Sequence, residues 1–277
     1  MSPSTELDRE MESYLGFLID HELDDAYETE PLNRTLSENK HAFKRAAAAP
    51  EQKAVSAAQG PATVSLLRPT SHGHLDMATL LHEAKGRAAA ARTLDELYAE
   101  LEAFQHMPMR HEGARALVRH HGTAEPKLLV IGDIPDAEED AAGQAFAGKP
   151  GAMMDIALKA AGFRDDAMLG ACAFWRPAGG RPLTPEDISL TQPFLHALIR
   201  LAAPKGLLLL GAGAVMSVMN LDQSLQKLRG RIITFGERDT ALPVMASFPP
   251  AFMIRQPACK ALFWRDLLLL KAAINKV

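Results

Sequence analysis

The residues best suited to chemistry follow four short apolar segments of the chain. They lie in the loops GDIPDAEED (132–140), FWRPAGGRPLTPED (174–187), GAGA (211–214) and SFPPAFMIRQP (247–257). Asp133 comes directly after the first apolar segment, where a carboxylate could act as a general base. An acid at the end of a strand is also common without any catalytic role, so both interpretations stay open. The Gly179–Gly180 pair could cradle a phosphate, but its place between two Arg-Pro pairs favours a plain turn.

Strands and helices alternate around these loops. The hydrophobic pattern predicts buried strands at 127–133, 167–175, 205–212 and 242–248. Helices are predicted at 74–91, 93–104, 152–163, 185–202, 213–220 and 260–274. Such alternation predicts an α/β fold, a three-layer αβα arrangement around a central parallel sheet. Ligands bind such sheets beyond the carboxyl ends of the strands, which is where the four loops would meet.

Composition excludes several classes of protein. The two cysteines, Cys172 and Cys259, lie far apart without a CxxC pattern, which argues against a disulfide framework or a zinc knuckle. No segment approaches the roughly 20 apolar residues of a membrane span, and the acidic start differs from a signal peptide. We therefore expect no membrane association and a cytoplasmic location. Residues 222–277 hold nine Lys or Arg against four acids, so this end could face nucleic acid.

The chain divides into three segments. Residues 1–30, with ten acids and one Arg, predict an acidic amphipathic helix, residues 31–73 a flexible linker, and residues 74–277 the ordered domain. One face of the helix carries an apolar stripe formed by Leu7, Met11, Leu15 and Leu18. The stripe indicates a binding surface for a protein partner, with docking on the chain's own domain as the alternative.

Five motifs, in order along the chain, are similar to those of one enzyme family. GDIPDAEEDAAGQAFAGKPG (132–151) resembles GEAPGxxEDxxGxPFVGxAG, and LGACAFWRPAGGRPLTPED (169–187) resembles ITNVVKCRPPGNRxPxPEE. LLLLGAGA (207–214) resembles VALGAxA, LQKLRGR (225–231) resembles xxLRGR, and FPPAFMIRQP (248–257) resembles YHPAYLLRNP. The chain thus resembles the bacterial iron–sulfur (family four) uracil-DNA glycosylases over roughly residues 95–277. The resemblance implies the uracil-DNA glycosylase fold, DNA as a partner, a role in DNA repair and a nucleoid-associated place in the cytoplasm.

The resemblance also carries over individual residues. Asp133 keeps an acid where the family has Glu, and Phe146 corresponds to the ring that stacks on a flipped base. The segment Phe252–Arg255 corresponds to the wedge that opens the double helix, and Arg229 and Arg231 correspond to phosphate contacts. Asp133 is therefore the candidate catalytic residue. The expected substrate- and DNA-binding residues are Gly132, Asp136, Phe146, Arg176, Arg229, Arg231, Pro249, Phe252, Met253 and Arg255.

The cluster-binding positions depart from the family pattern. The four cysteines that would hold the iron–sulfur cluster fall on Gln105, Pro108, Trp175 and Thr191. Such clusters require thiolate ligands. We therefore expect no cofactor and no bound metal, with the ring of Trp175 filling the volume of the cluster.

The base-recognition positions also depart from the pattern. The Asn that reads the uracil edge in the family falls on Ala171, which has no polar side-chain atom. The His that contacts the uracil oxygen falls on Pro249, which offers neither a side-chain donor nor a backbone N–H. Asp136 replaces the second Gly of GEAPG and brings a carboxylate to where the family brings its backbone close to the base.

Three functions stay open on these residues. The first is a DNA-binding member of the superfamily, defective in uracil excision, that works with a repair or replication protein held by the acidic helix. The second is an active, cluster-free DNA glycosylase with altered base specificity. The third is a protein-interaction module that has lost DNA binding. Salt-dependent DNA binding separates the third from the others, and an excision assay separates the first from the second.

Overall fold

The computed structural model describes residues 76–236 and 241–276. The predicted N-terminal helix with its stripe of Leu7, Met11, Leu15 and Leu18, and the predicted linker at 31–73, lie outside the described residues. Across the described part of the chain, none of the helices combines the length and the apolar character that a membrane crossing needs.

A six-stranded sheet forms the centre of the described domain. Its order is β1-β3-β2-β4-β6-β5. The four inner strands are mutually parallel, as predicted, whereas β1 and β5 pair antiparallel at the two edges. The strands are β1 (His121–Gly122), β2 (Leu128–Gly132), β3 (Ala167–Ala171), β4 (Gly206–Leu210), β5 (Ile233–Phe235) and β6 (Leu242–Ser247).

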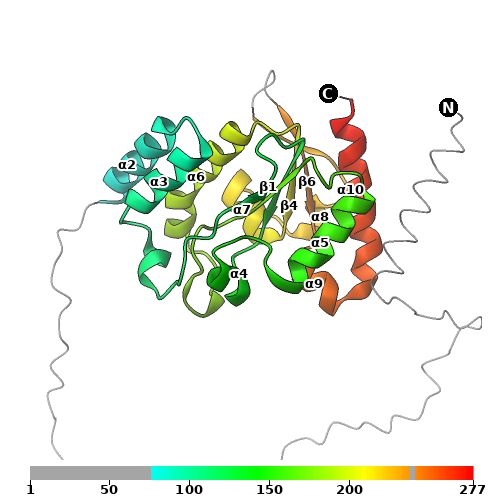
Figure 1. Ribbon diagram of the computed structural model, residues 1–277, viewed down its shortest axis with the longest axis horizontal. Coiled ribbons are helices and arrows are strands. Elements are labelled where there is room, and N and C mark those ends of the chain that lie inside the picture. Colours follow the sequence, from blue (N-terminus) through cyan, green and yellow to red (C-terminus); the bar gives the residue numbers. More distant parts are fainter. Residues whose placement is uncertain (1–75, 237–240, 277) are drawn as a thin grey trace, which may run out of the picture. The chain divides into compact units, whose positions relative to one another are not determined.

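Helices cover both faces of this sheet, which confirms the three-layer αβα prediction (Figure 1). On one face Leu129 and Ile131 of β2 pack in a core with α2 (Met77–Ala90), α3 (Leu94–Ala103), α6 (Pro185–Ala202) and α7 (Ala212–Met219). On the other face Leu128 and Val130 pack with α5 (Gly148–Ala160), α9 (Pro250–Arg255) and α10 (Lys260–Ile274). Because both faces of β2 are buried, its sequence is apolar throughout instead of alternating.

Short helices complete the connections between these elements. The structure adds α4, α8, α9 and three 3₁₀ turns to the helices that the hydrophobic pattern predicted, because elements of one or two turns carry too few residues to show a period. Their bounds are α4 (Ala137–Ala142), α8 (Leu225–Leu228), η1 (Pro108–His111), η2 (Ala178–Gly180) and η3 (Pro257–Cys259).

Helix α10 runs antiparallel to the strands it covers. Near its C-terminus, Ile274 packs at the start of β4, where a Cβ on Gly206 would stand 2.7 Å from the Ile274 Cγ1. In the middle of the helix, Asp266 accepts a 2.6 Å hydrogen bond from Ser247, the last residue of β6. The first turn of α10 therefore lies past the carboxyl ends of the strands, at the same end of the domain as α4 and α9 (Figure 1).

Candidate functional site

The carboxyl edge of the sheet brings together Gly132, Phe146 and Ala171. Gly132 and Ala171 are register partners at the ends of β2 and β3, and Cys172 N–H donates to the Gly132 carbonyl at 3.0 Å. The ring of Phe146 lies over Gly132, so closely that a Cβ there would stand 2.8 Å from the ring Cζ. The carboxyl edge thus has an aromatic ring, 7% exposed, packed on the bare backbone of Gly132, and a methyl group at position 171.

The backbone of Phe146 is held in an unusual conformation. Its φ is +56°, in the left-handed region that costs energy for a residue with a side chain. Its N–H donates to the carboxylate of Glu139, which also accepts from Asp136 N–H at 2.8 Å. The first turn of α5 packs so tightly on this segment that a Cβ on Gly151 would collide with the Phe146 carbonyl oxygen, 1.7 Å away. These contacts fix the position of the ring.

Asp136 is the residue that caps the start of α4. Its side chain accepts hydrogen bonds from the backbone N–H groups of Glu138 and Glu139, at 2.8 and 2.9 Å. With the reciprocal bond from Glu139, this forms a capping box that starts α4. One oxygen of the exposed Asp136 carboxylate is therefore engaged as a helix cap, and its place beside the base stays a prediction. Burial raises the pKa of Glu139, the other member of the capping box.

Asp133 lies against the first turn of α7. One of its carboxylate oxygens accepts from Ile134 N–H at 3.0 Å. A Cβ on Gly211 would stand 2.4 Å from Asp133 Oδ2, and one on Gly213 would stand 2.2 Å from Oδ1. The two glycines of GAGA therefore leave the space that the carboxylate occupies. Burial raises the pKa of Asp133 above its ordinary value, with the Ile134 hydrogen bond acting in the opposite direction.

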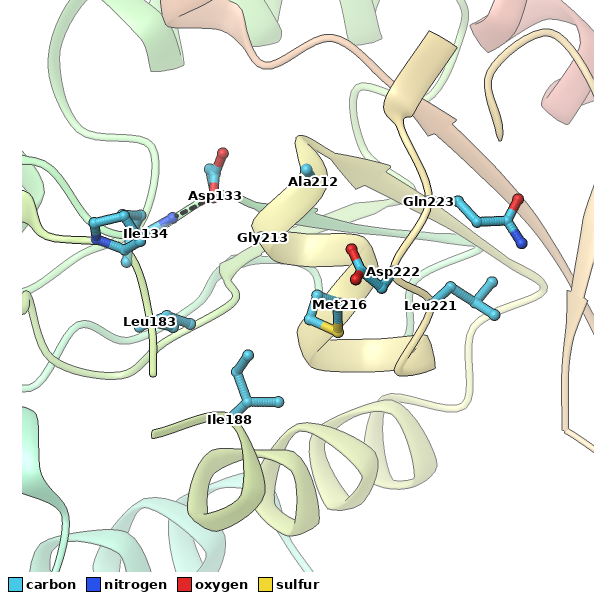
Figure 2. Close-up of a pocket in the computed structure, with 11 residues that line it drawn as sticks. Asp133, Ile134, Leu183, Ile188, Ala212, Gly213, Met216, Leu221, Asp222 and Gln223 are labelled. Atoms are coloured by element: carbon cyan, nitrogen blue, oxygen red, sulfur yellow. Dashed lines mark hydrogen bonds between the residues drawn. The ribbon is translucent and has the colours of Figure 1, made fainter. Parts of the chain in front are cut away.

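A cavity of about 360 Å³ opens beside Asp133. Figure 2 shows Asp133 next to the start of α7, with Met216 of α7 and Ile188 of α6 on the cavity wall. The remaining lining residues are Ile134, Pro182, Leu183, Ala212, Gly213, Leu221, Asp222 and Gln223. Its walls are largely apolar, with the Asp133 and Asp222 carboxylates as the charged groups. A site of this kind takes a flat or apolar group that carries a few polar atoms.

The loop after β3 supplies one side of this cavity. Arg181 holds the loop in place by pairing with Glu112 and with Asp187 of α6, the latter at 2.6 Å. The adjacent Gly179 and Gly180 both have positive φ in the turn η2, so the simpler interpretation of this pair, a turn, describes the structure.

Arg176, at the start of the same loop, is only partly exposed. Its Nε is buried without a hydrogen-bond partner in the part of the chain that the structure describes. The rest of the guanidinium lies beside the η2 turn, since a Cβ on Gly180 would stand 3.7 Å from Arg176 Nη2. A partly exposed guanidinium at the carboxyl edge, with its Nε unsatisfied, is suited to bind an anionic group.

The fourth loop places Pro249 at the carboxyl edge, as the residue that caps α9. The preceding Phe248 stacks on Phe252, with ring centroids 5.3 Å apart and planes 24° apart. Ile254 and Arg255 are exposed on α9, whereas Met253 is fully buried in the core beneath it. The expected wedge is therefore corrected: Met253 packs inward, and Phe252, Ile254 and Arg255 remain available to a ligand.

Arg229 also differs from its expected role. Its guanidinium donates to both carboxylate oxygens of the buried Asp266, at 2.9 and 3.1 Å, and lies over the ring of Phe248. It is thus an internal ion pair that supports the fourth loop, and the expectation of a phosphate contact is corrected for this residue. Arg231, two positions on, is exposed.

Comparison with known proteins agrees with this arrangement of motifs. The family described as the uracil DNA glycosylase superfamily matches residues 119–268, which is more than half of the chain. The chain belongs to the uracil-DNA glycosylase superfamily. This confirms the resemblance that the motifs indicated.

Similar members of the superfamily carry the name type-4 uracil-DNA glycosylase. The protein from Pyrobaculum aerophilum is 25% identical over 162 residues, which cover 57% of this chain and 83% of that relative. The protein from Thermotoga maritima is 27% identical over 147 residues, 52% of this chain and 75% of the relative. The protein from Archaeoglobus fulgidus is 21% identical over 179 residues, 63% of this chain and 89% of the relative.

The cluster positions of this superfamily member do not fit an iron–sulfur cluster. Trp175 is buried in the core, with the guanidinium of Arg110 over its ring at 5.6 Å. Thr191 is fully buried and its hydroxyl donates to the sulfur of Met107 at 3.5 Å. Packed side chains thus stand at two of the four expected ligand positions, and the other two, the exposed Gln105 and the partly buried Pro108, also lack a thiolate. Among the described residues, no group of three or more His, Cys, Asp or Glu side chains is placed to hold a metal ion.

Sequence reasoning missed the residues that support this glycosylase-like site. The capping box of Asp136 and Glu139 could have been found, because an acid followed three residues later by Glu marks a helix start. The glycine pair of GAGA also signals close approach of another group. The apolar cavity lining could not have been found, because Leu183, Met216 and Leu221 resemble core residues in sequence.

Proposed function

We propose that this protein binds DNA as a superfamily member in DNA repair or replication and has lost efficient uracil excision. The observation that carries the proposal is the methyl group of Ala171, directly beside Gly132 at the edge covered by the Phe146 ring. A ring and a bare backbone can hold a flat base by stacking. A methyl group offers no hydrogen bond to the edge of that base.

The missing donors bear on rate as well as on recognition. Proline at 249 supplies no donor where negative charge develops on the uracil oxygen in the family. Removal of one such donor typically costs about 10²–10³ in rate. The methyl group of Ala171 removes the hydrogen bonds through which a polar pocket rejects the wrong base. Both losses spare the stacking ring and the exposed basic residues, which contribute to binding.

DNA binding is supported by the residues left free at the carboxyl edge. Arg176 has an unsatisfied buried Nε, and Arg231 and Arg255 are exposed. Phe252 and the exposed Ile254 lie beside Arg255 on α9. Basic side chains next to an apolar edge are what a protein needs to hold phosphates and to enter a stack of bases.

The proposal is tested by titration of the full chain against duplex and single-stranded oligonucleotides, with and without an abasic-site analogue, at several salt concentrations. We expect affinity to fall linearly with the logarithm of salt concentration and to increase at the abasic site. The variant Arg255→Ala should weaken all complexes and reduce the salt slope by about one. An affinity too weak to detect at low salt would contradict the proposal and favour a protein-interaction module.

A second candidate is an active, cluster-free glycosylase for a base other than uracil. The cavity beside Asp133 favours this second candidate. The partly buried Asp133 carboxyl could accept a hydrogen bond from an exocyclic amino group of a base, or, when protonated, donate one to an exocyclic oxo group. A single-turnover panel of duplexes, each with a different damaged or deaminated base, tests this candidate. Release of any base, abolished by Asp133→Asn, would support it, and a panel without release would exclude these substrates.

A protein partner at the acidic N-terminus is the last part of the proposal. Its support is the sequence stripe of Leu7, Met11, Leu15 and Leu18 alone, and the class of partner is a repair or replication protein. The substitution Leu15→Asp should abolish the association of a co-purifying protein and leave DNA affinity unchanged. Unchanged association would contradict docking through the stripe. The cytoplasmic, nucleoid-associated location and the bacterial origin stay predictions.

A further inference from the structure

Lys260 is a largely buried lysine at the first position of α10, where the residue is 6% exposed. The buried carboxylates of the domain all have partners: Asp140 accepts from Arg115 N–H, Asp187 pairs with Arg181, and Asp266 pairs with Arg229. The side-chain amine of Lys260, in contrast, has no hydrogen bond or ion pair with any residue that the structure describes. The buried stem thus carries an amine that no acid of the described domain neutralises.

The surroundings of Lys260 shift its amine toward the neutral form. Burial lowers the pKa of the amine below its ordinary value, with no acid nearby to oppose the shift. The N-terminal end of a helix carries partial positive charge, which also disfavours a cation on the first residue of α10. The nitrogen is not among the fully enclosed polar atoms, so the amine reaches the surface at the end of a buried stem. A neutral, accessible amine is a nucleophile.

Lys260 lies beyond the carboxyl ends of the strands, the edge where the proposed function places the DNA. Asp266 lies level with the end of β6 through its bond to Ser247, and Lys260 is six residues earlier in α10. At about 1.5 Å per residue, Lys260 lies roughly 9 Å beyond the strand ends. The turn η3 packs against both α9 and α10, so Lys260 follows directly on the segment with Phe252, Ile254 and Arg255.

We propose that the Lys260 amine forms an imine with the C1′ aldehyde of an abasic site in bound DNA. The inference rests on the proposed DNA binding. The nitrogen bonds to C1′ of the ring-opened sugar, its two protons go to the carbonyl oxygen, and that oxygen leaves as water. No oxidant or reductant is needed. The substrate is the product of any reaction that removes a base from DNA, so the protein would hold abasic sites covalently and reversibly.

Borohydride trapping tests the inference. The full chain is mixed with a duplex that contains one abasic site, then reduced with sodium borohydride, which converts an imine to a stable amine. We expect a covalent protein–DNA product, and peptide mapping of that product should place the DNA on Lys260. Lys260→Arg and Lys260→Met should lose the product. Lys271→Arg, on the same helix at its other end, is the matched control and should keep it.

The outcomes separate this inference from the proposed function. A duplex with a tetrahydrofuran analogue has no aldehyde, so its affinity reports DNA binding alone. Binding of the analogue without any trapped product, or a product mapped to another lysine, would overturn the inference and leave the proposed function in place. A trapped product that survives in Lys260→Arg would also overturn it. Absence of binding to either duplex would overturn both.

Discussion

Phe146 covers Gly132 so closely that a Cβ at position 132 would stand 2.8 Å from the ring Cζ. Gly132→Ala should therefore push the ring away and lower the free energy of unfolding by about 1–3 kcal/mol, as overpacking does. It should also weaken binding to abasic-site DNA. Gly86→Ala is the control, because a Cβ there meets nothing within 4 Å and alanine in the middle of α2 should stabilise by about 0.5–1 kcal/mol. Urea denaturation and DNA titration measure both effects.

The two arginines near position 230 should respond in opposite ways. Arg229→Ala leaves the buried Asp266 without its counterion and should cost about 3–5 kcal/mol of stability. Arg231→Ala removes an exposed charge and should leave stability within about 0.5 kcal/mol, while DNA binding weakens. Chemical denaturation paired with a salt titration checks the contrast. Equal stability losses would show that the assignment of Arg229 as an internal ion pair is wrong.

Met253 and Ile254 form a similar pair on α9. Met253 is fully buried, and its replacement by alanine should destabilise the protein by about 2–5 kcal/mol through the cavity it leaves. Ile254 is 44% exposed, so Ile254→Ala should change stability little and weaken the complex with abasic-site DNA. Thermal melts and binding curves for the two variants measure this. Suppose that Met253→Ala, at a temperature where it stays folded, binds abasic-site DNA more weakly while Ile254→Ala binds normally. That result would contradict the assignment of Met253 to the core and of Ile254 to the DNA-binding surface.

Asp133 should give the protein a defined pH dependence. Burial raises its pKa, so in the window above 3.8 the folded protein keeps a proton that the unfolded chain has lost. That proton stabilises the fold at the low end of the window, and the stabilisation is lost as pH rises through the folded pKa. The stability of Asp133→Asn relative to the parent should therefore increase with pH across the window and then level off. Denaturation curves at several pH values test this, with the exposed Glu125→Gln as control. A pH-independent difference would contradict the buried carboxylate.

Hydrophobic pattern was sufficient for the large elements of this fold. The bounds of α6 and α10 match the predicted ranges 185–202 and 260–274, since long apolar segments show the period of a helix, and α6 also begins with a capping box. The edge strands β1 and β5, with two and three residues, carry no readable pattern. Side-chain roles were harder to predict, because they depend on partners far away in sequence. Arg229 faces Asp266 thirty-seven positions on, and no local rule reveals that pairing.

The most direct test of the account is single-turnover uracil excision. The full chain, in excess over single-stranded and duplex oligonucleotides with one uracil, is compared with the type-4 uracil-DNA glycosylase of Thermotoga maritima under the same conditions. We predict excision several powers of ten slower than that control, because two donors that each contribute about 10²–10³ are missing at Ala171 and Pro249. The double substitution Ala171→Asn, Pro249→His should increase whatever rate remains. Excision by the unmodified protein at a rate comparable with the control would contradict the account.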